Sequence, residues 1–227
     1  PSAHLLGAGL AALERSLHTV RLPLATEYIR ASGINRLIST TCADRIGIVA
    51  AGKPYLDLRQ ALRDLGLDER DLARYGIRLL KLGAIHPVEP SIIKEFAGGL
   101  SEIIVVEEKR SFIEAAIKDI LYAVPGAPAV HGKAGPDGTT LFSEIGELGP
   151  EAIAAAVARR LTAHGDIGSV TAWRSRRRGE RIWLPLLTRT PYFCSGCPHN
   201  SSTKVPEGSL VGAGIGCHTM AVFMEPG

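Results

Sequence analysis

The feature that most constrains the fold is a near-continuous apolar run, Ile46 to Ala51. A strand with no polar alternation is typical of a parallel sheet, where both faces are buried. Further apolar runs and helical patterns alternate after it in chain order: a helix at 54–65, a strand at 77–82, a helix at 90–97, a strand at 103–106 and a helix at 111–122. Three strand–helix units predict an α/β domain whose parallel sheet is covered by helices on both faces.

Local signals set the helix ends. Pro54 suits a first helical turn and Gly66 a stop, with Leu58, Leu62 and Leu65 on one face. A capping box at Ser111 and Glu114 opens the third helix, where Glu114 and Lys118 also pair at i,i+4.

Helical patterning also flanks this region. Leu10, Leu13 and Leu17 recur at helical spacing, and a second helical segment runs from Leu22-Pro23 to Gly33. An alanine-rich helix begins at Pro150, and His164-Gly165 closes the domain. No G-x-G-x-x-G follows the first strand, which argues against a dinucleotide-binding domain.

Composition excludes several classes of protein. The 227 residues are 45% apolar, enough for a sizeable core, yet no run of eighteen apolar residues or signal-peptide pattern is present. Three of the four cysteines cluster with Gly and His, which suits a reducing compartment, so we expect a cytoplasmic protein with no membrane contact. The basic run at 173–181 is interpreted as a solvated linker, with no nucleic-acid partner. Lys109 and Arg110, beside Glu107 and Glu108, are interpreted as a solvated interdomain rim, with contact to an anion or to a neighbouring domain as the alternative.

Any redox chemistry of this chain is expected in the cysteine-rich stretch, 190–220. Cys194 and Cys197 lie on a tight turn through Gly196, and Cys217 follows a glycine-broken apolar stretch, 210–215, that predicts a short strand. Three interpretations remain open on these residues alone. They are a structural pair, a zinc site completed by His199 or His218, and an iron–sulfur cluster completed by a thiolate outside the chain.

The stretches YFCSGCPHNSSTKVPEGS and GAGIGCH resemble the start of the thiamine-diphosphate-binding domain of the indolepyruvate ferredoxin oxidoreductases, in their fused long form. In this 2-oxoacid:ferredoxin oxidoreductase family, the matching cysteines are three ligands of a [4Fe-4S] cluster. The resemblance therefore implies Cys194, Cys197 and Cys217 as ligands, with the fourth outside the chain. It also places Gly216 and His218 near thiamine diphosphate.

A second resemblance covers IVAAGKPYLDLRQAL and IIVVEEKRSFIE, which look like the transketolase C-terminal-like domain of the same enzymes. Together the two imply an internal segment of such an enzyme. Its expected parts are a helical connection from a pyrimidine-binding domain (1–44), the transketolase C-terminal-like domain (45–165), a basic linker (166–187) and the start of the thiamine-diphosphate domain (188–227).

By resemblance, the parent enzyme oxidatively decarboxylates indolepyruvate or a related aryl or branched 2-oxoacid to an acyl-CoA and passes the electrons to ferredoxin. It uses thiamine diphosphate with Mg²⁺ and [4Fe-4S]. The Gly-Asp-Gly motif and the glutamate that the thiamine site needs are missing here, so we expect no catalytic residue in this segment, no bound cofactor and no activity from it alone. We expect its partners to be sister domains of the parent chain and a second copy in a homodimer. The alternative is a non-enzymatic α/β assembly domain with a zinc-stapled cysteine loop.

Overall fold

The computed structural model describes residues 8–39, 41, 43–177, 190–210, 212 and 214–223. The chain divides into two compact units, Pro1–Gly179 and Glu180–Gly227, and each has its own structure. Cys42 lies outside the described residues, as does the second half of the basic run, 178–181.

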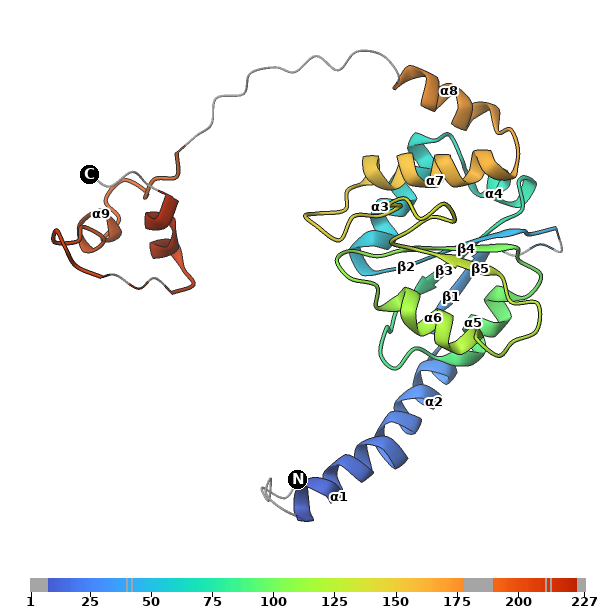
Figure 1. Cartoon of the computed structure of the whole chain (residues 1–227), viewed down its shortest axis with the longest axis horizontal. Helices are drawn as coiled ribbons and strands as arrows, with labels where there is room; N and C mark the ends of the chain where they lie inside the picture. The colour runs from blue at the N-terminus through green and yellow to red at the C-terminus, as the bar shows by residue number, and fades with distance from the viewer. Residues whose placement is uncertain are drawn as a thin grey trace. The chain divides into compact units, whose positions relative to one another are not determined.

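The first unit is built on a five-stranded sheet (Figure 1). Its strands are β1 (Arg36–Ser39), β2 (Ile46–Ala51), β3 (Ile77–Leu82), β4 (Glu102–Val106) and β5 (Ala129–His131). The order across the sheet is β1-β3-β2-β4-β5, and all neighbours run parallel except β1, which pairs antiparallel with β3 at one edge. The predicted parallel sheet is therefore confirmed, with an antiparallel edge strand added.

Helices cover both faces of this sheet, as predicted (Figure 1). One face carries α3 (Gly52–Asp64), α4 (Glu69–Arg74) and α7 (Pro150–His164), and the other carries α5 (Pro90–Ala97) and α6 (Ile113–Leu121). Each face of the sheet has its own hydrophobic core. The interior strands contribute side chains to both cores, because successive side chains point to opposite faces. Ile48 and Ile104 join the α3 and α7 core, while Val49 and Val105 join the α5 and α6 core.

Gly47 lets α5 approach β2. A Cβ at this position would lie 2.5 Å from Leu100 Cδ1 and 2.6 Å from Phe96 Cζ, so no larger residue fits without movement of the core. The glycine inside the apolar run is thus a packing requirement.

The N-terminal helices are α1 (Ala8–Ser16), η1 (Leu17–Arg21) and α2 (Leu22–Ser32). η1 is a π-helical turn, and the backbone stays helical on both sides of it. Gly33, with φ 60° in the left-handed region, ends α2 as predicted.

The predicted capping box at Ser111 and Glu114 is wrong. Phe112 occupies the N-cap position of α6 and makes no side-chain cap bond. Glu107 caps the helix instead, because its carboxylate accepts hydrogen bonds from the backbone N–H groups of Phe112, Ile113 and Glu114 at 2.8–3.1 Å. The predicted Glu114–Lys118 pair is present, with 2.6 Å between Lys118 Nζ and Glu114 Oε1.

Two elements of the sheet domain lie outside the bounds predicted for it, 45–165. The sheet begins with β1, ahead of residue 45, and α8 (Gly168–Arg176) lies within the predicted linker. Val170 of α8 is fully buried in the α3 and α7 core, which ties this helix to the domain.

The second unit contains α9 (His199–Ser202) and the 3-10 helix η2 (Cys217–Phe223). The strand predicted at 210–215 is not found at the described positions 210, 212, 214 and 215, where Leu210 and Ile215 are fully exposed. A strand needs a neighbour to satisfy its backbone, and the described part of this unit offers none. Among the helices of the described residues, none combines the length and apolarity that crossing a bilayer requires.

Candidate functional site

The Cys194–Cys197 turn has the geometry of a chelating loop. The Cys197 N–H donates to the Cys194 carbonyl at 3.0 Å, and Gly196 supplies the left-handed backbone with φ 76°. Asn200 closes the turn, because its side-chain Nδ2 also donates to the Cys194 carbonyl at 3.1 Å. Cys194 is exposed and Cys197 half-buried, and both are free thiols.

Two histidines lie beside this turn. Cys197 Sγ is 3.2 Å from His199 Nδ1, and the His199 ring stacks on buried Phe193, with 5.3 Å between the ring centroids. His218 stacks on the other histidine at 6.1 Å and accepts a 2.9 Å hydrogen bond from the Gly214 N–H through Nε2. Both predicted histidine positions therefore lie near the turn.

Cys217 is exposed and free at the start of η2. Gly216 precedes it with φ 153°, and a Cβ there would meet the His218 ring at 3.0 Å. Within the described residues, no three His, Cys, Asp or Glu side chains are gathered closely enough to hold a metal ion. The structure thus forms the two-cysteine turn and the histidine pair, while the assignment of the three thiols to one centre stays a prediction.

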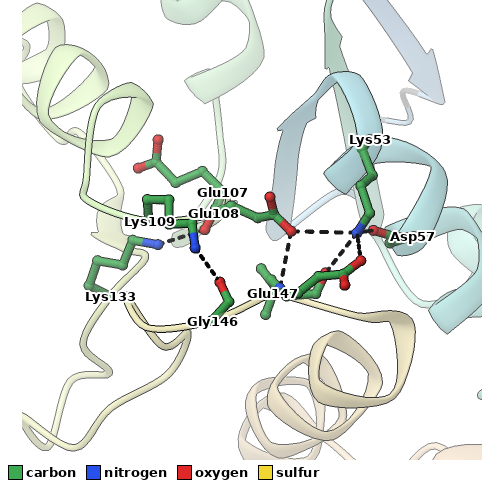
Figure 2. A network of polar contacts seen from close by, with 9 residues as sticks. Lys53, Asp57, Glu107, Glu108, Lys109, Lys133, Gly146 and Glu147 are labelled. Atoms are coloured by element: carbon green, nitrogen blue, oxygen red, sulfur yellow. Dashed lines mark hydrogen bonds and ion pairs between the residues drawn. The ribbon is translucent and has the colours of Figure 1, made fainter. Parts of the chain in front are cut away.

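A second polar site lies where β2 and β4 end, at the carboxyl edge of the parallel sheet (Figure 2). Lys53, in the first turn of α3, contacts Asp57 Oδ2 at 2.7 Å, Glu147 Oε1 at 2.9 Å and Glu108 Oε1 at 3.4 Å. Hydrogen bonding to Asp57 and then Glu147 raises the Lys53 pKa. The Leu148 N–H donates to Glu108 at 3.0 Å, and this bond is the main cause of the lowered Glu108 pKa.

Lysines extend this network toward β5. Lys109 Nζ donates to the Gly146 carbonyl at 2.7 Å, and Lys133 Nζ to the Glu107 carbonyl at 2.6 Å (Figure 2). Burial lowers the Lys133 pKa, although nearby carboxylates oppose that effect. Lys53, Glu108 and Lys109 contact residues 146–148 and hold this loop onto the sheet. Lys133 binds the backbone just after β4 instead.

A third charged cluster lies at the opposite, amino edge. Glu102 is 3% exposed and accepts from Arg160 Nε and Nη2 at 2.7 and 2.8 Å and contacts His164 Nε2 at 2.5 Å. Burial would raise the Glu102 pKa, but hydrogen bonds from Arg160 and His164 outweigh it and lower the pKa. Sequence spacing alone gave no sign of this cluster, because 58 residues separate Glu102 from Arg160.

Most of the chain is similar to known proteins. The sequence model described as "Indolepyruvate oxidoreductase domain" matches residues 36–176. The indolepyruvate oxidoreductase subunit IorA of Methanothermobacter marburgensis is 30% identical over 203 residues, covering 84% of this chain and 29% of the relative. The same subunit of Thermococcus kodakarensis is 26% identical over 184 residues, covering 79% of this chain and 26% of the relative. The chain thus spans less than a third of these relatives.

Two solved structures are similar to parts of the chain. One is a 2-oxoglutarate:ferredoxin oxidoreductase from Magnetococcus marinus, with a TM-score of 0.41 and 15% identity over 71% of this chain and 24% of that one. The other is a split-gene transketolase described as an inactive beta4 tetramer, with a TM-score of 0.39 and 18% identity over 56% of this chain and 41% of that one. With TM-scores this low, neither likeness bears on function.

Proposed function

The chain belongs to the indolepyruvate oxidoreductase family, whose domain matches residues 36–176, and on that premise we propose that it is a segment of a thiamine-diphosphate- and iron–sulfur-dependent 2-oxoacid:ferredoxin oxidoreductase. The parent enzyme would oxidatively decarboxylate indolepyruvate or a related aryl or branched 2-oxoacid to an acyl-CoA. Ferredoxin would receive the electrons. We propose a cytoplasmic homodimer as its working form.

The observation that carries this proposal is the cysteine turn that follows the family domain in the sequence. Cys194 and Cys197 present two free thiols from one hydrogen-bonded turn, and Cys217 presents a third exposed thiol. Soft thiolates are the donors that iron–sulfur clusters take, so the donor set fits such a group. The fourth thiolate would come from outside the chain.

Each part of the segment has a separate role in this proposal. The three cysteines would hold a [4Fe-4S] cluster, and Gly216 and His218 would lie near thiamine diphosphate. When bound, the cluster would accept and release single electrons, and thiamine diphosphate with Mg²⁺ would supply the carbanion chemistry. The sheet domain would serve as a supporting body, because its strands are buried and its lysines at the carboxyl edge are bonded to groups of the same domain.

Anaerobic reconstitution of the full-length enzyme tests the ligand assignment. The variants Cys194→Ala, Cys197→Ala and Cys217→Ala should each lose iron and the EPR signal of the cluster, because each removes one thiolate. Cys42→Ala is the matched control and should keep both, since Cys42 lies far in the sequence from the cysteine-rich stretch. An undiminished signal in the three variants would refute the assignment.

One contact favours a second candidate, a zinc-stapled assembly domain without catalysis. Cys197 Sγ and His199 Nδ1 lie 3.2 Å apart, and cysteine with histidine is a usual zinc donor pair. Metal analysis of the anaerobically purified full-length protein separates the two candidates. Iron with acid-labile sulfide supports the oxidoreductase, whereas stoichiometric zinc without iron supports the assembly domain.

A further inference from the structure

The N-terminal helical stretch, Ala8–Ser32, carries two apolar stripes. On α2, Leu22, Ala25 and Ile29 share one side and are partly or fully buried, with Ile29 only 7% exposed. A second stripe, Val20, Leu24 and Tyr28, repeats every four residues and is 49%, 64% and 72% exposed. A helix that is apolar on two sides is suited to lie between two bodies, and the described residues cover only one of these sides.

The exposed stripe is a row at helical spacing. Val20 lies in the π-helical turn η1, and Leu24 and Tyr28 follow it on α2 at steps of four residues. We name Val20, Leu24 and Tyr28 the outer stripe. Side chains four residues apart form ridges on a helix surface, and such ridges pack into the grooves of a facing helix. The spacing therefore favours a helix as the partner.

The exposed Leu56 does not belong to such a row. Leu56 on α3 is 67% exposed, close to the value for Leu24. The residues three and four positions away from it on the helix are Gly52, Lys53, Arg59 and Gln60, and none of them is a large apolar residue. A single exposed leucine is ordinary on a protein surface, whereas a row of exposed apolar side chains marks an interaction site.

We propose that the outer stripe is the docking surface for a helix from another part of the same long polypeptide. This inference rests on the proposed function, in which the chain is one segment of a larger enzyme. In the Methanothermobacter marburgensis relative, the matched region is 29% of the chain, so most of that polypeptide is available for contact. A tethered partner acts at an effective concentration in the millimolar range, which favours it over a second copy.

Photo-crosslinking in the full-length enzyme tests the proposal. Leu24→p-benzoylphenylalanine and Tyr28→p-benzoylphenylalanine place a probe on the outer stripe, and the Tyr28 variant changes the side chain least. Leu56→p-benzoylphenylalanine is the control of matched exposure. After irradiation, peptide mass spectrometry of a mixture of isotopically light and heavy enzyme distinguishes links within one chain from links between copies.

We expect both outer-stripe probes to link to one helical segment of the same polypeptide, outside residues 1–227, and the Leu56 probe to give no product there. Links between light and heavy chains would assign the stripe to a second copy and overturn the proposal. Absence of a link from both stripe positions, or equal yield from position 56, would also overturn it. Oxidoreductase activity of the same preparations reports on the proposed function separately, because an active enzyme without these links refutes only the docking surface.

Discussion

The sheet domain and the cysteine segment are held by different means. Two interior strands of the sheet, β2 and β4, are buried along nearly their whole length, and helices pack on both faces. Among the described residues of 190–223, only Phe193 is buried, and the segment is closed by short hydrogen-bonded turns. Apolar burial is the main driving force of folding, so the first region has its own source of stability.

This difference in stability bears on the function that each region can have. Burial fixes the sheet domain regardless of any bound group, which suits a supporting body. We expect the segment 190–223, whose described residues bury so little surface, to gain order from a bound metal, since the free energy of metal binding and the free energy of folding are shared in small sites. The distinctive feature of residues 190–223 is therefore their three thiols, and not a hydrophobic core.

Metal removal should produce the largest contrast between the two regions. When the reconstituted full-length enzyme is treated with an iron chelator, we expect amide exchange in 190–223 to rise strongly while exchange in β2 and β4 stays unchanged. Hydrogen–deuterium exchange followed by mass spectrometry measures both regions in one experiment. Equal increases in both would show that the segment is held by packing and not by its metal.

Within the sheet domain, Glu102→Gln should have the largest effect on stability. It leaves Arg160 and His164 without their shared carboxylate, which we expect to lower the free energy of unfolding by roughly 3 kcal/mol, as for other broken buried ion pairs. Urea unfolding followed by circular dichroism measures the loss. Glu69→Gln is the control, because Glu69 forms an exposed pair with Arg59 and should cost less than about 1 kcal/mol.

The same variant should change the pH dependence of stability. Since the pKa of Glu102 is lowered in the folded protein, its contribution is present above the unfolded value of about 4.3 and is lost as the pH falls through the folded pKa. Urea unfolding across the acid range should therefore show a shallower decline for Glu102→Gln than for the wild type. Parallel declines would mean that the carboxylate is not stabilised by its partners.

A substitution at Gly47, which packs closely in the core, should have a smaller effect on stability. Gly47→Ala places a methyl group against Phe96 and Leu100 and should lower the free energy of unfolding by about 1–3 kcal/mol. Gly168→Ala, at the open start of α8, should not destabilise the protein, because a Cβ there has no atom within 4 Å. Equal effects of the two changes in urea unfolding would contradict the packing role of Gly47.

The cap of α6 gives the smallest effect. Glu107→Ala removes the acceptor for three backbone N–H groups and should cost about 0.5–2 kcal/mol, whereas Ser111→Ala should stay within about 0.5 kcal/mol. Thermal unfolding of the two variants side by side measures the difference. A larger loss for Ser111→Ala would restore the capping box that the sequence predicted.

The sequence alone determined the regular elements whose signals are local. The bounds of β2, β3 and α5 match the predicted runs, and Gly33 ends α2 where its freedom to adopt positive φ predicts. These signals depend on periodicity and on proline and glycine stereochemistry, which neighbours in the chain already define. The motif around Cys194 and Cys197 is local in the same sense, and its turn formed as predicted.

Tertiary structure decided what depends on partners distant in the chain. Two short strands, β1 and β5, exist because longer neighbours supply their hydrogen bonds, and the predicted strand at 210–215 lacks such a neighbour among the described residues. Glu107, from the preceding strand end, reached the N–H groups that Ser111 was expected to cap. Glu102 meets Arg160 only after the sheet and α7 have packed. Pairing, capping from a distance and buried charge all require groups brought together by the fold, so local sequence carries no record of them.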